Sequence, residues 1–437
     1  MNLQNRRILV DGYNLELPKG TGIKTYGISL VRALQKLNAK VDILYSIPFH
    51  KQGLTKINVE KMFFEPTLES DLKYLNYYIS YFLRTLFNTS VTAKQLSLTD
   101  TLLCERQNNF NSKSFERKNI LHLPLCYRLA NQSFKKFSLQ LKIAPTKKID
   151  VWHATYPLPI EIVGAKKITT IHDLIPLRLP STTLDNKKFY YRLVKSAIDT
   201  SELIITISEN TKQDLIEIYK CPENKIAVTY QPVAIERGHK TEVEVINYLQ
   251  THNLQANNYI LFVGAIEPKK NLGRAIDAYK QSSTTMPLVV VGKKGWLWQQ
   301  DLAKLDSLPK SQTDNISKWA LVLDFVSDED LEYLYRGAYC LVFPSLYEGF
   351  GLPVLEAMSF GCPIITSNTS SLPEICQDAA LYVNPYSTDD IANKLERLTQ
   401  DTALRTHLSH TGKIRAKFFS RENYLTRLSS AYQKLFI

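Results

Sequence analysis

The sequence predicts an α/β protein made of two tandem domains, each containing a doubly wound parallel sheet. The chain has 437 residues, which is more than one ordinary domain holds. Short apolar runs alternate with helical patterns in two separate series, which is typical of parallel strands joined by helices. A polar interval separates the two series. We therefore expect a first domain over residues 1–236, a linker over 237–258, a second domain over 259–415 and a C-terminal helix over 416–437.

In the first series, apolar residues at three-residue steps, such as Ile28, Val31 and Leu34, predict a helix over 26–37. A second helix is expected over 211–219. Residues 50–147 show no clear pattern. The strands expected in this series are 7–11, 41–45, 151–153, 167–171, 203–207 and 226–229.

In the second series, the expected helices are 271–280, 328–335 and 352–360, and a last helix is expected over 421–436. Parallel strands end at one edge of their sheet, so two such domains in tandem place a ligand in a crevice beyond the carboxyl ends of the strands. The strands expected in this series are 259–263, 287–291, 320–323, 340–343, 363–366 and 380–383.

The most informative segment, residues 340–374, reads as strand, glycine-containing loop, helix, glycine stop and strand. It carries two carboxylates, Glu348 in the loop and Glu356 in the helix, with seven residues between them. The loop places the backbone N–H groups of Phe350, Gly351 and Leu352 at a helix N-terminus, which favours an anion. A phosphate site flanked by two acids suits an enzyme that uses a nucleotide sugar.

Each acid also has a simpler explanation. Glu348 could be an acid that stabilises the helix N-terminus. Glu356 lies in a helix that is apolar almost all round, so it is expected to be buried. A buried carboxylate is costly unless it is paired or hydrogen-bonded. Ligand hydroxyl groups would satisfy Glu356, and so would an unseen Arg or Lys.

This segment resembles the retaining GT-B glycosyltransferases of glycosyltransferase family 4. The residues that carry the resemblance run from Glu348 through Gly349, Phe350, Gly351, Leu352 and Pro353 to Glu356. The resemblance implies that Glu348 contacts the donor sugar, that Glu356 binds the ribose hydroxyls, and that the amides from Gly349 to Leu352 hold the diphosphate. It further implies two Rossmann-like domains facing a central crevice, an acceptor-side first domain, a nucleotide-sugar-binding second domain, and a C-terminal helix that crosses back to the first domain.

Two more segments match the family. Lys269 and Lys270 follow the strand at 259–263, and the resemblance implies that they meet the donor diphosphate. Lys269 stands where mannosyltransferase relatives usually carry Arg, and a lysine cannot form the bidentate fork. His172, followed by Asp173, is implied to touch the donor sugar near the leaving phosphate, although a lone histidine is often structural. Its context, IHDLIPLRLP, most resembles bacterial polysaccharide mannosyltransferases.

Gly22, with Gly20 and Thr21, resembles the family's first-domain glycine loop, which approaches the phosphates. A dinucleotide fingerprint is the rival interpretation, but the loop begins too far after the first strand, and Gly20, Gly22 and Gly27 miss the required spacing. Val326 lies in the segment 325–331, which resembles the loop that backs the nucleobase through main-chain groups. Ser327 or Asp328 is a suitable N-cap for the helix that follows.

The net charge of +12 indicates an acidic partner, and nucleic acid, anionic lipid and phosphate-bearing substrate are the candidates. Residues 117–148 contain eight Lys or Arg and no Asp or Glu. Within them, Phe134, Phe137 and Leu141 are expected to share one helical face, with Lys135, Lys136 and Lys142 elsewhere on the helix. Such a helix is typical of a membrane interface, and a solvated basic face is the alternative. Residues 72–87 suggest an apolar core or lip helix.

The six cysteines form no C-x-x-C pair, so no zinc or thioredoxin-like motif is indicated. No paired-aspartate metal motif stands out, and neither a metal nor a cofactor is expected. No signal peptide precedes the first strand, and no apolar run is long enough to span a bilayer. We expect a cytoplasmic protein, and the basic segment would favour a peripheral place on the cytosolic face of the inner membrane.

The resemblance implies a metal-independent, retaining hexosyltransferase with Glu348 and His172 as catalytic residues. Mannose from GDP-mannose is the first choice of donor, and this choice rests on the local resemblance alone. A growing, lipid-linked glycan of a cell-surface polysaccharide is the expected acceptor, and nucleic acid is disfavoured. The alternatives are a transferase that uses a UDP-sugar, a non-catalytic basic lipid- or nucleic-acid-binding protein on a degenerate GT-B scaffold, and a sugar-nucleotide epimerase.

Overall fold

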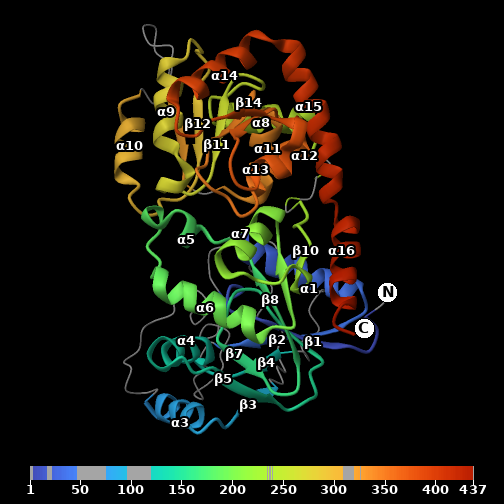
Figure 1. The fold of residues 1–437 in the computed structure, drawn as a ribbon. Coiled ribbons are helices and arrows are strands. Elements are labelled where there is room, and N and C mark those ends of the chain that lie inside the picture. The colour runs from blue at the N-terminus through green and yellow to red at the C-terminus, as the bar shows by residue number, and fades with distance from the viewer. Residues whose placement is uncertain are drawn as a thin grey trace.

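The computed structural model describes residues 3–16, 22–46, 75–95, 120–233, 235, 238, 240–308, 319–324 and 326–436. Two sheets, each covered by helices, form the two halves of the molecule, the first in the lower part of Figure 1 and the second in the upper part. Both sheets are built mainly from parallel pairs. The α/β prediction with two Rossmann-like domains is confirmed.

The first sheet has the strand order β10-β9-β8-β6-β1-β2-β4-β3-β5-β7. Its central strands are largely buried on both faces, as parallel strands covered by helices should be. Each lies within one residue of its expected bounds. They are β1 (Arg7–Asp11), β2 (Lys40–Tyr45), β6 (Val151–Ala154), β8 (Lys166–Ile171), β9 (Leu203–Thr206) and β10 (Ile226–Val228).

Four further strands extend this sheet, three of them within the part of the sequence that showed no clear pattern and the last between β6 and β8. They are β3 (Val91–Gln95), β4 (Ile120–His122), β5 (Leu141–Pro145) and β7 (Ile160–Ile162). Strands β3 and β4 pair in antiparallel fashion, unlike the parallel pairs elsewhere in the described sheets. These strands have three to five residues, and their buried side chains alternate with partly buried or exposed ones, so they lack the continuous apolar run of the central strands.

The expected basic amphipathic helix is wrong in its second half. Helix α4 (Cys126–Phe137) ends because Ser138 adopts a left-handed conformation with φ of 60°. Leu141 and Lys142 therefore lie in β5. Phe134 and Leu141 are 4% and 1% exposed, so they belong to the core, whereas Phe137 is 49% exposed. The helical spacing of these side chains therefore arises from two separate elements and not from one continuous helix.

The remaining helices of the first half are α1 (Gly22–Lys36), α3 (Leu75–Leu86), α5 (Ile175–Arg178), α6 (Lys187–Thr200) and α7 (Glu209–Tyr219). Helix α1 begins four residues before its expected start. Apolar periodicity marks the buried turns, here those of Tyr26, Leu30 and Leu34, and does not mark where a helix begins.

The second sheet has the order β13-β12-β11-β14-β15-β16, and all its pairs are parallel. Every strand lies within one residue of its expected bounds. The strands are β11 (Ile260–Val263), β12 (Leu288–Val291), β13 (Ala320–Leu323), β14 (Cys340–Phe343), β15 (Ile364–Ser367) and β16 (Leu381–Val383). The helices are α8 (Glu242–Thr251), α9 (Leu272–Gln281), α10 (Gln299–Asp306), α11 (Asp328–Gly337), α12 (Leu352–Phe360), α13 (Leu372–Cys376), α14 (Thr388–Gln400) and α15 (Thr402–Ala416).

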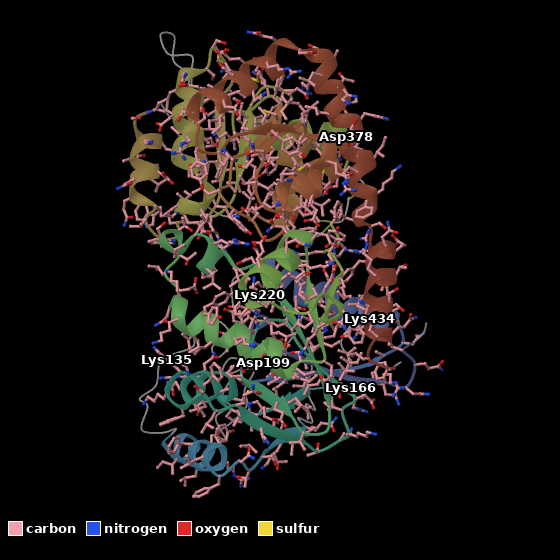
Figure 2. All side chains as sticks on the ribbon, in the orientation of Figure 1. Lys135, Lys166, Asp199, Lys220, Asp378 and Lys434 are labelled. Atoms are coloured by element: carbon pink, nitrogen blue, oxygen red, sulfur yellow. The ribbon has the colours of Figure 1, made fainter. Side chains whose placement is uncertain are left out.

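The last helix, α16 (Arg421–Gln433), leaves the second half and packs against the first (Figure 1). The Tyr432 hydroxyl lies 2.6 Å from His153 Nδ1 of β6, and both side chains are buried. The Lys166 amine donates to the Leu435 carbonyl, and Figure 2 shows Lys166 and Lys434 near each other on the lower half. The C-terminal segment therefore ties the two halves together.

Candidate active site

The loop between β14 and α12 ends in a helix N-terminus with available amides. Gly351 has φ of 105°, a left-handed conformation that favours glycine, and α12 begins at the next residue. The Ser371 hydroxyl lies 3.0 Å from the Glu348 carbonyl and 2.8 Å from the Phe350 carbonyl, which holds the loop in place. Within the described parts of the chain, no acceptor takes the N–H groups of Phe350, Gly351 or Leu352. These donors can therefore serve an anion.

Lys270 and Glu348 form an ion pair beside this helix end. The distance from Lys270 Nζ to Glu348 Oε1 is 2.6 Å, and the two side chains are 14% and 10% exposed. Lys270 also lies 5.2 Å from the centre of the Phe343 ring, at the end of β14. The pair joins two loops that are 78 residues apart in the sequence, and it keeps the carboxylate in place without a ligand.

Lys269 points to a different acid. Its Nζ lies 3.3 Å from Glu267 Oε1. Burial lowers the pKa of Lys269, but the carboxylates of Glu267, Asp173 and Glu348 outweigh burial, so the pKa is raised above its ordinary value. The side chain is therefore a fixed positive charge near Glu348.

His172 lies at the carboxyl end of β8 and is 8% exposed. Its Nε2 is 2.8 Å from the Thr155 carbonyl, which can only accept, so Nε2 carries the proton. Burial lowers the pKa of His172 to about 4, although the bond to Thr155 opposes this shift. The ring is neutral at physiological pH. Because no described residue bonds to Nδ1, that atom can accept a hydrogen bond from a ligand hydroxyl.

Gly349 brings the His172 loop of the first half against the Glu348 loop of the second. A Cβ atom at Gly349 would lie 2.5 Å from the His172 carbonyl oxygen and 2.8 Å from Asp173 Cβ. Only a glycine permits this approach. The carboxylate of Asp173 accepts a 3.0 Å hydrogen bond from the Ile175 amide, so Asp173 holds the backbone of its own loop.

Glu356 is buried, as its apolar helix predicted, at 8% exposure. It accepts one hydrogen bond, from the Tyr335 hydroxyl at 3.0 Å. In the part of the chain that the structure describes, no Lys or Arg pairs with it. Burial raises the pKa of Glu356 to about 8, the Tyr335 bond opposes the shift, and Asp328 at the start of α11 adds to it. The alternative explanation, a Lys or Arg partner for Glu356, therefore finds no support among the described residues.

The remaining expected site residues are placed less completely. A Cβ at Gly22, the first residue of α1, would lie 3.6 Å from Leu352 Cδ1, so Gly22 faces the start of α12. Gly20 and Thr21 lie outside the described residues. Val326 packs partly buried before α11, whose N-cap is Ser327 in a capping box with Asp330. Phe325 also lies outside the described residues.

Some supporting residues were not identified from the sequence. Asn271 has φ of 60° and donates from Nδ2 to the carbonyls of Pro344 and Pro385, at 2.9 and 2.7 Å. It thereby anchors the turn that carries Lys270 to the end of β14. Its position just after two lysines and before a helix was the available signal, because asparagine favours left-handed turns.

Contacts between the halves were also not predicted. The Glu374 carboxylate of α13 accepts from the Glu209 and Asn210 amides at the start of α7, at 2.7 and 3.1 Å. The Tyr347 hydroxyl, next to Glu348, accepts a 2.8 Å bond from Asn210 Nδ2 and donates to Asp214. Such pairs cannot be read from sequence spacing, since they join residues more than 130 positions apart.

Within the described residues, no group of three or more His, Cys, Asp or Glu side chains could hold a metal ion. Positive charge at the candidate site comes from Lys269, Lys270 and the N-terminus of α12. This arrangement can stabilise a diphosphate.

The comparisons with known proteins agree with this geometry. Residues 247–415 match the model of "Glycosyl transferases group 1", and residues 104–237 match that of "Glycosyltransferase Family 4". The chain is 32% identical over 279 residues to the O-antigen chain mannosyltransferase B of Escherichia coli, covering 62% of this chain and 71% of that protein. It is 30% identical to the O-antigen chain mannosyltransferase RfbU of Salmonella typhimurium, over 56% of this chain and 63% of the other.

Among solved structures, sucrose-phosphate synthase from Thermosynechococcus elongatus aligns with a TM-score of 0.64 at 15% identity, and covers 99% of each chain. At that identity the likeness shows the fold alone, and it matches the two-sheet architecture described above. Together with the two family models and the sequence relatives, it shows that the chain belongs to the family-4 glycosyltransferases and has the GT-B fold.

Proposed function

We propose that this glycosyltransferase transfers mannose from GDP-mannose, with retention of configuration, to a hydroxyl of a growing cell-surface polysaccharide. The mannosyltransferase relatives support the sugar. The observation that carries the proposal is the Lys270–Glu348 ion pair, which lies between the N-terminus of α12 and the His172 loop. The positive charge of Lys270 suits a departing phosphate, and the negative charge of Glu348 suits a sugar on which positive charge develops.

The leaving group is a nucleoside diphosphate. Lys269, Lys270 and the unused amides at the start of α12 are the groups that would stabilise its growing negative charge. Lys270 need not leave Glu348 to do so, because an ammonium group has three donors and the ion pair occupies one.

The sugar would lie between Glu348 and His172. The Glu348 carboxylate would stabilise the positive charge that develops at the anomeric carbon. His172 Nδ1 would accept a hydrogen bond from a hydroxyl group of the sugar. In the retaining step, the bond from the anomeric carbon to the phosphate oxygen breaks and the bond to the acceptor oxygen forms on the same face. The proton of the acceptor hydroxyl then passes to the departing phosphate oxygen, so no separate base is required.

Glu356 would accept hydrogen bonds from the two ribose hydroxyls. It has one protein partner, Tyr335, and its burial makes an unsatisfied charge costly. The ribose would supply the missing donors. This role is shared by GDP- and UDP-sugars, so it does not distinguish the base.

The part of the first half that contains α3 and α4 is proposed to bind an anionic membrane surface. Helix α3 exposes Ile79, Phe82, Leu83 and Leu86, by 37 to 52%, and the Phe82 ring lies 5.3 Å from the exposed ring of Phe137 on α4. Lys135 and Lys136 precede Phe137 on α4 and are exposed, and Figure 2 shows Lys135 at the outer side of the lower half. No helix of the described chain is long and apolar enough to cross a bilayer. Apolar side chains with lysines beside them suit binding at an interface.

The membrane proposal is tested by sedimentation with anionic liposomes at low salt. Replacing Lys135 and Lys136 by Glu should reduce the bound fraction, because each lysine near such a surface contributes about 1 kcal/mol. The same charge change at Lys394 and Arg397 on α14 is the control and should not. Wild-type protein that ignores anionic liposomes would end the membrane proposal.

The reaction is tested by incubating the protein with a panel of GDP- and UDP-sugars and a short mannose-terminated acceptor. Mannose transfer from GDP-mannose, with an α linkage in the product by NMR, is the expected result. A UDP-sugar as the better donor would identify the alternative transferase. An inverted anomeric centre would refute the retaining step, and a free epimer without transfer would identify an epimerase. Binding without turnover for every sugar would favour a non-catalytic protein.

A further inference from the structure

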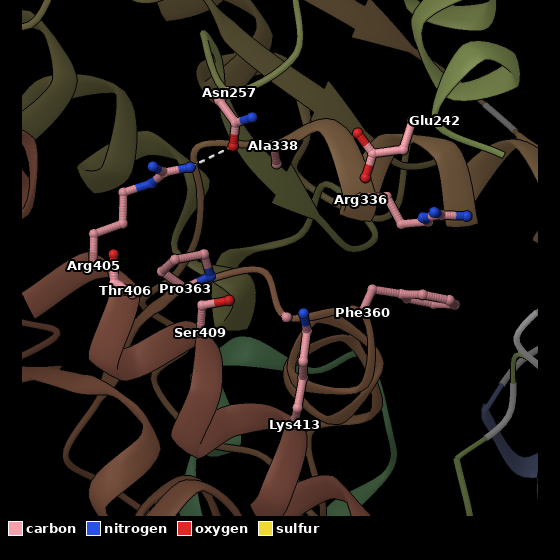
Figure 3. A pocket seen from close by; sticks show the side chains of 11 residues that line it. Glu242, Asn257, Arg336, Ala338, Phe360, Pro363, Arg405, Thr406, Ser409 and Lys413 are labelled. Carbon is pink, nitrogen blue, oxygen red and sulfur yellow. Dashed lines mark hydrogen bonds between the residues drawn. The ribbon is translucent and has the colours of Figure 1, made fainter. Parts of the chain in front are cut away.

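A polar pocket of about 320 Å³ lies in the second half of the molecule, and Figure 3 shows the side chains that line it. Asn257, Ala338 and Pro363 line it, and they come just before β11, β14 and β15. The pocket is thus at the amino edge of the sheet, whereas the candidate active site is at the carboxyl edge. Phe360 and Gly361 place it at the C-terminal end of α12.

Three cations surround this pocket. Arg336 comes from α11, and Arg405 and Lys413 come from α15. Thr406 and Ser409 add hydroxyl groups from α15, and Figure 3 shows Ser409, Lys413 and Arg405 along the side of the pocket formed by that helix. The lining contains one acid, Glu242. The pocket therefore carries a positive charge on the wall of a concave site.

These cations retain unused donors. Arg336 Nη1 donates to the Lys240 carbonyl at 2.6 Å and lies 3.7 Å from Glu332 Oε1, and Arg405 donates to the Asn257 side chain. Each guanidinium has five N–H donors, so most are left over. Arg405 Nε is buried and has no partner. Lys413 forms no ion pair or hydrogen bond with the described residues. A Cβ on Gly361 would lie 2.1 Å from Lys413 Cε, so the lysine packs over the end of α12.

We propose that this pocket binds a small phosphate ester of about the size of a sugar phosphate. Its volume is at the lower end of the roughly 300 to 1,000 Å³ that small-molecule sites occupy. Guanidinium groups match the oxygens of a phosphoryl group, and a lysine adds a point charge. The partly buried Phe360 supplies an apolar wall for the organic part. The proposal does not depend on the glycosyltransferase reaction.

Calorimetry with the full-length protein tests the proposal, with mannose 1-phosphate, inorganic phosphate and neutral methyl mannoside as probes. We expect mannose 1-phosphate to bind, with an affinity that falls as salt rises, and methyl mannoside not to bind at this pocket. Replacing Arg405 and Lys413 by Gln should weaken binding by about tenfold or more, since each substitution removes a charge-assisted contact. Replacing Lys394 and Arg397 by Gln on α14 is the matched control and should leave the affinity unchanged.

The candidate active site also attracts phosphate, so Lys270→Met is measured in parallel. If Lys270→Met abolishes binding while the pocket variant keeps it, the ester binds at the active site and the proposal is wrong. Equal affinity in all variants, or no binding by the wild type, also overturns it. If inorganic phosphate binds as tightly as mannose 1-phosphate, the pocket recognises the phosphate group alone. That result would refute the proposed binding of a phosphate ester. Arg405 holds the Asn257 side chain, so replacing it can affect folding. If the double variant does not fold, Lys413→Glu gives the same test, because Lys413 is exposed.

Discussion

Replacing Glu356 by Gln should make the ligand-free protein more stable, and the gain should grow with pH. Burial raises the pKa of Glu356 to about 8, from an ordinary value of 4.5. Between these two values the folded state holds a proton that the unfolded state releases. The free energy of unfolding therefore falls as pH rises through this window, and above about pH 8 the penalty is constant.

The magnitude follows from the size of the shift. Each pKa unit corresponds to about 1.4 kcal/mol, so a shift of about 3.5 units costs the wild type about 4 to 5 kcal/mol above the window. Glutamine does not titrate and can still accept the Tyr335 hydrogen bond. From about pH 6 to about pH 8.5, the stability of the variant should rise relative to the wild type by about 2 to 3 kcal/mol.

Thermal melting of the two proteins at both pH values measures this difference. Glu161→Gln changes an exposed carboxylate and is the control, which should show no comparable trend. A difference between Glu356→Gln and the wild type that does not change with pH would refute the buried, proton-binding carboxylate. The same variant should bind GDP and UDP at least about tenfold more weakly, because the amide accepts fewer ribose hydrogen bonds than the carboxylate.

Four further predictions test the candidate site. Glu348→Ala should lower kcat more than it lowers affinity for GDP, measured by kinetics and calorimetry, and an equal loss would remove its role at the sugar. Gly349→Ala should lower both Tm and activity, because its Cβ would lie 2.5 Å from the His172 carbonyl; unchanged melting would show that the loops can separate freely. Glu374→Ala should lower Tm by an amount equivalent to about 1 kcal/mol, since it leaves the Glu209 and Asn210 amides without their acceptor. EDTA should leave activity intact, and activity restored only by a divalent ion would contradict a site that relies on lysines.

The strands and helices of the second half were predictable from sequence because their signals are local. Its strands are continuous apolar runs such as Cys340–Phe343, bounded by glycine or proline, and a buried parallel strand leaves that pattern wherever it occurs. The burial of Glu356 could be predicted in the same way, from its apolar neighbours in one short helix. The helix N-terminus that follows Gly351 could be predicted from the glycines around Phe350 and the apolar helix after them.

Tertiary structure alone decided which distant residues meet. The Lys270–Glu348 pair, the approach of Gly349 to His172 and the capping of α7 by Glu374 join segments that no periodicity connects. The same limit explains the misjudged segment around Phe134 and Leu141, where a left-handed Ser138 ends the helix and both side chains turn into the core. Local patterns report whether a side chain is buried, but the partner it is buried against depends on how the whole chain folds.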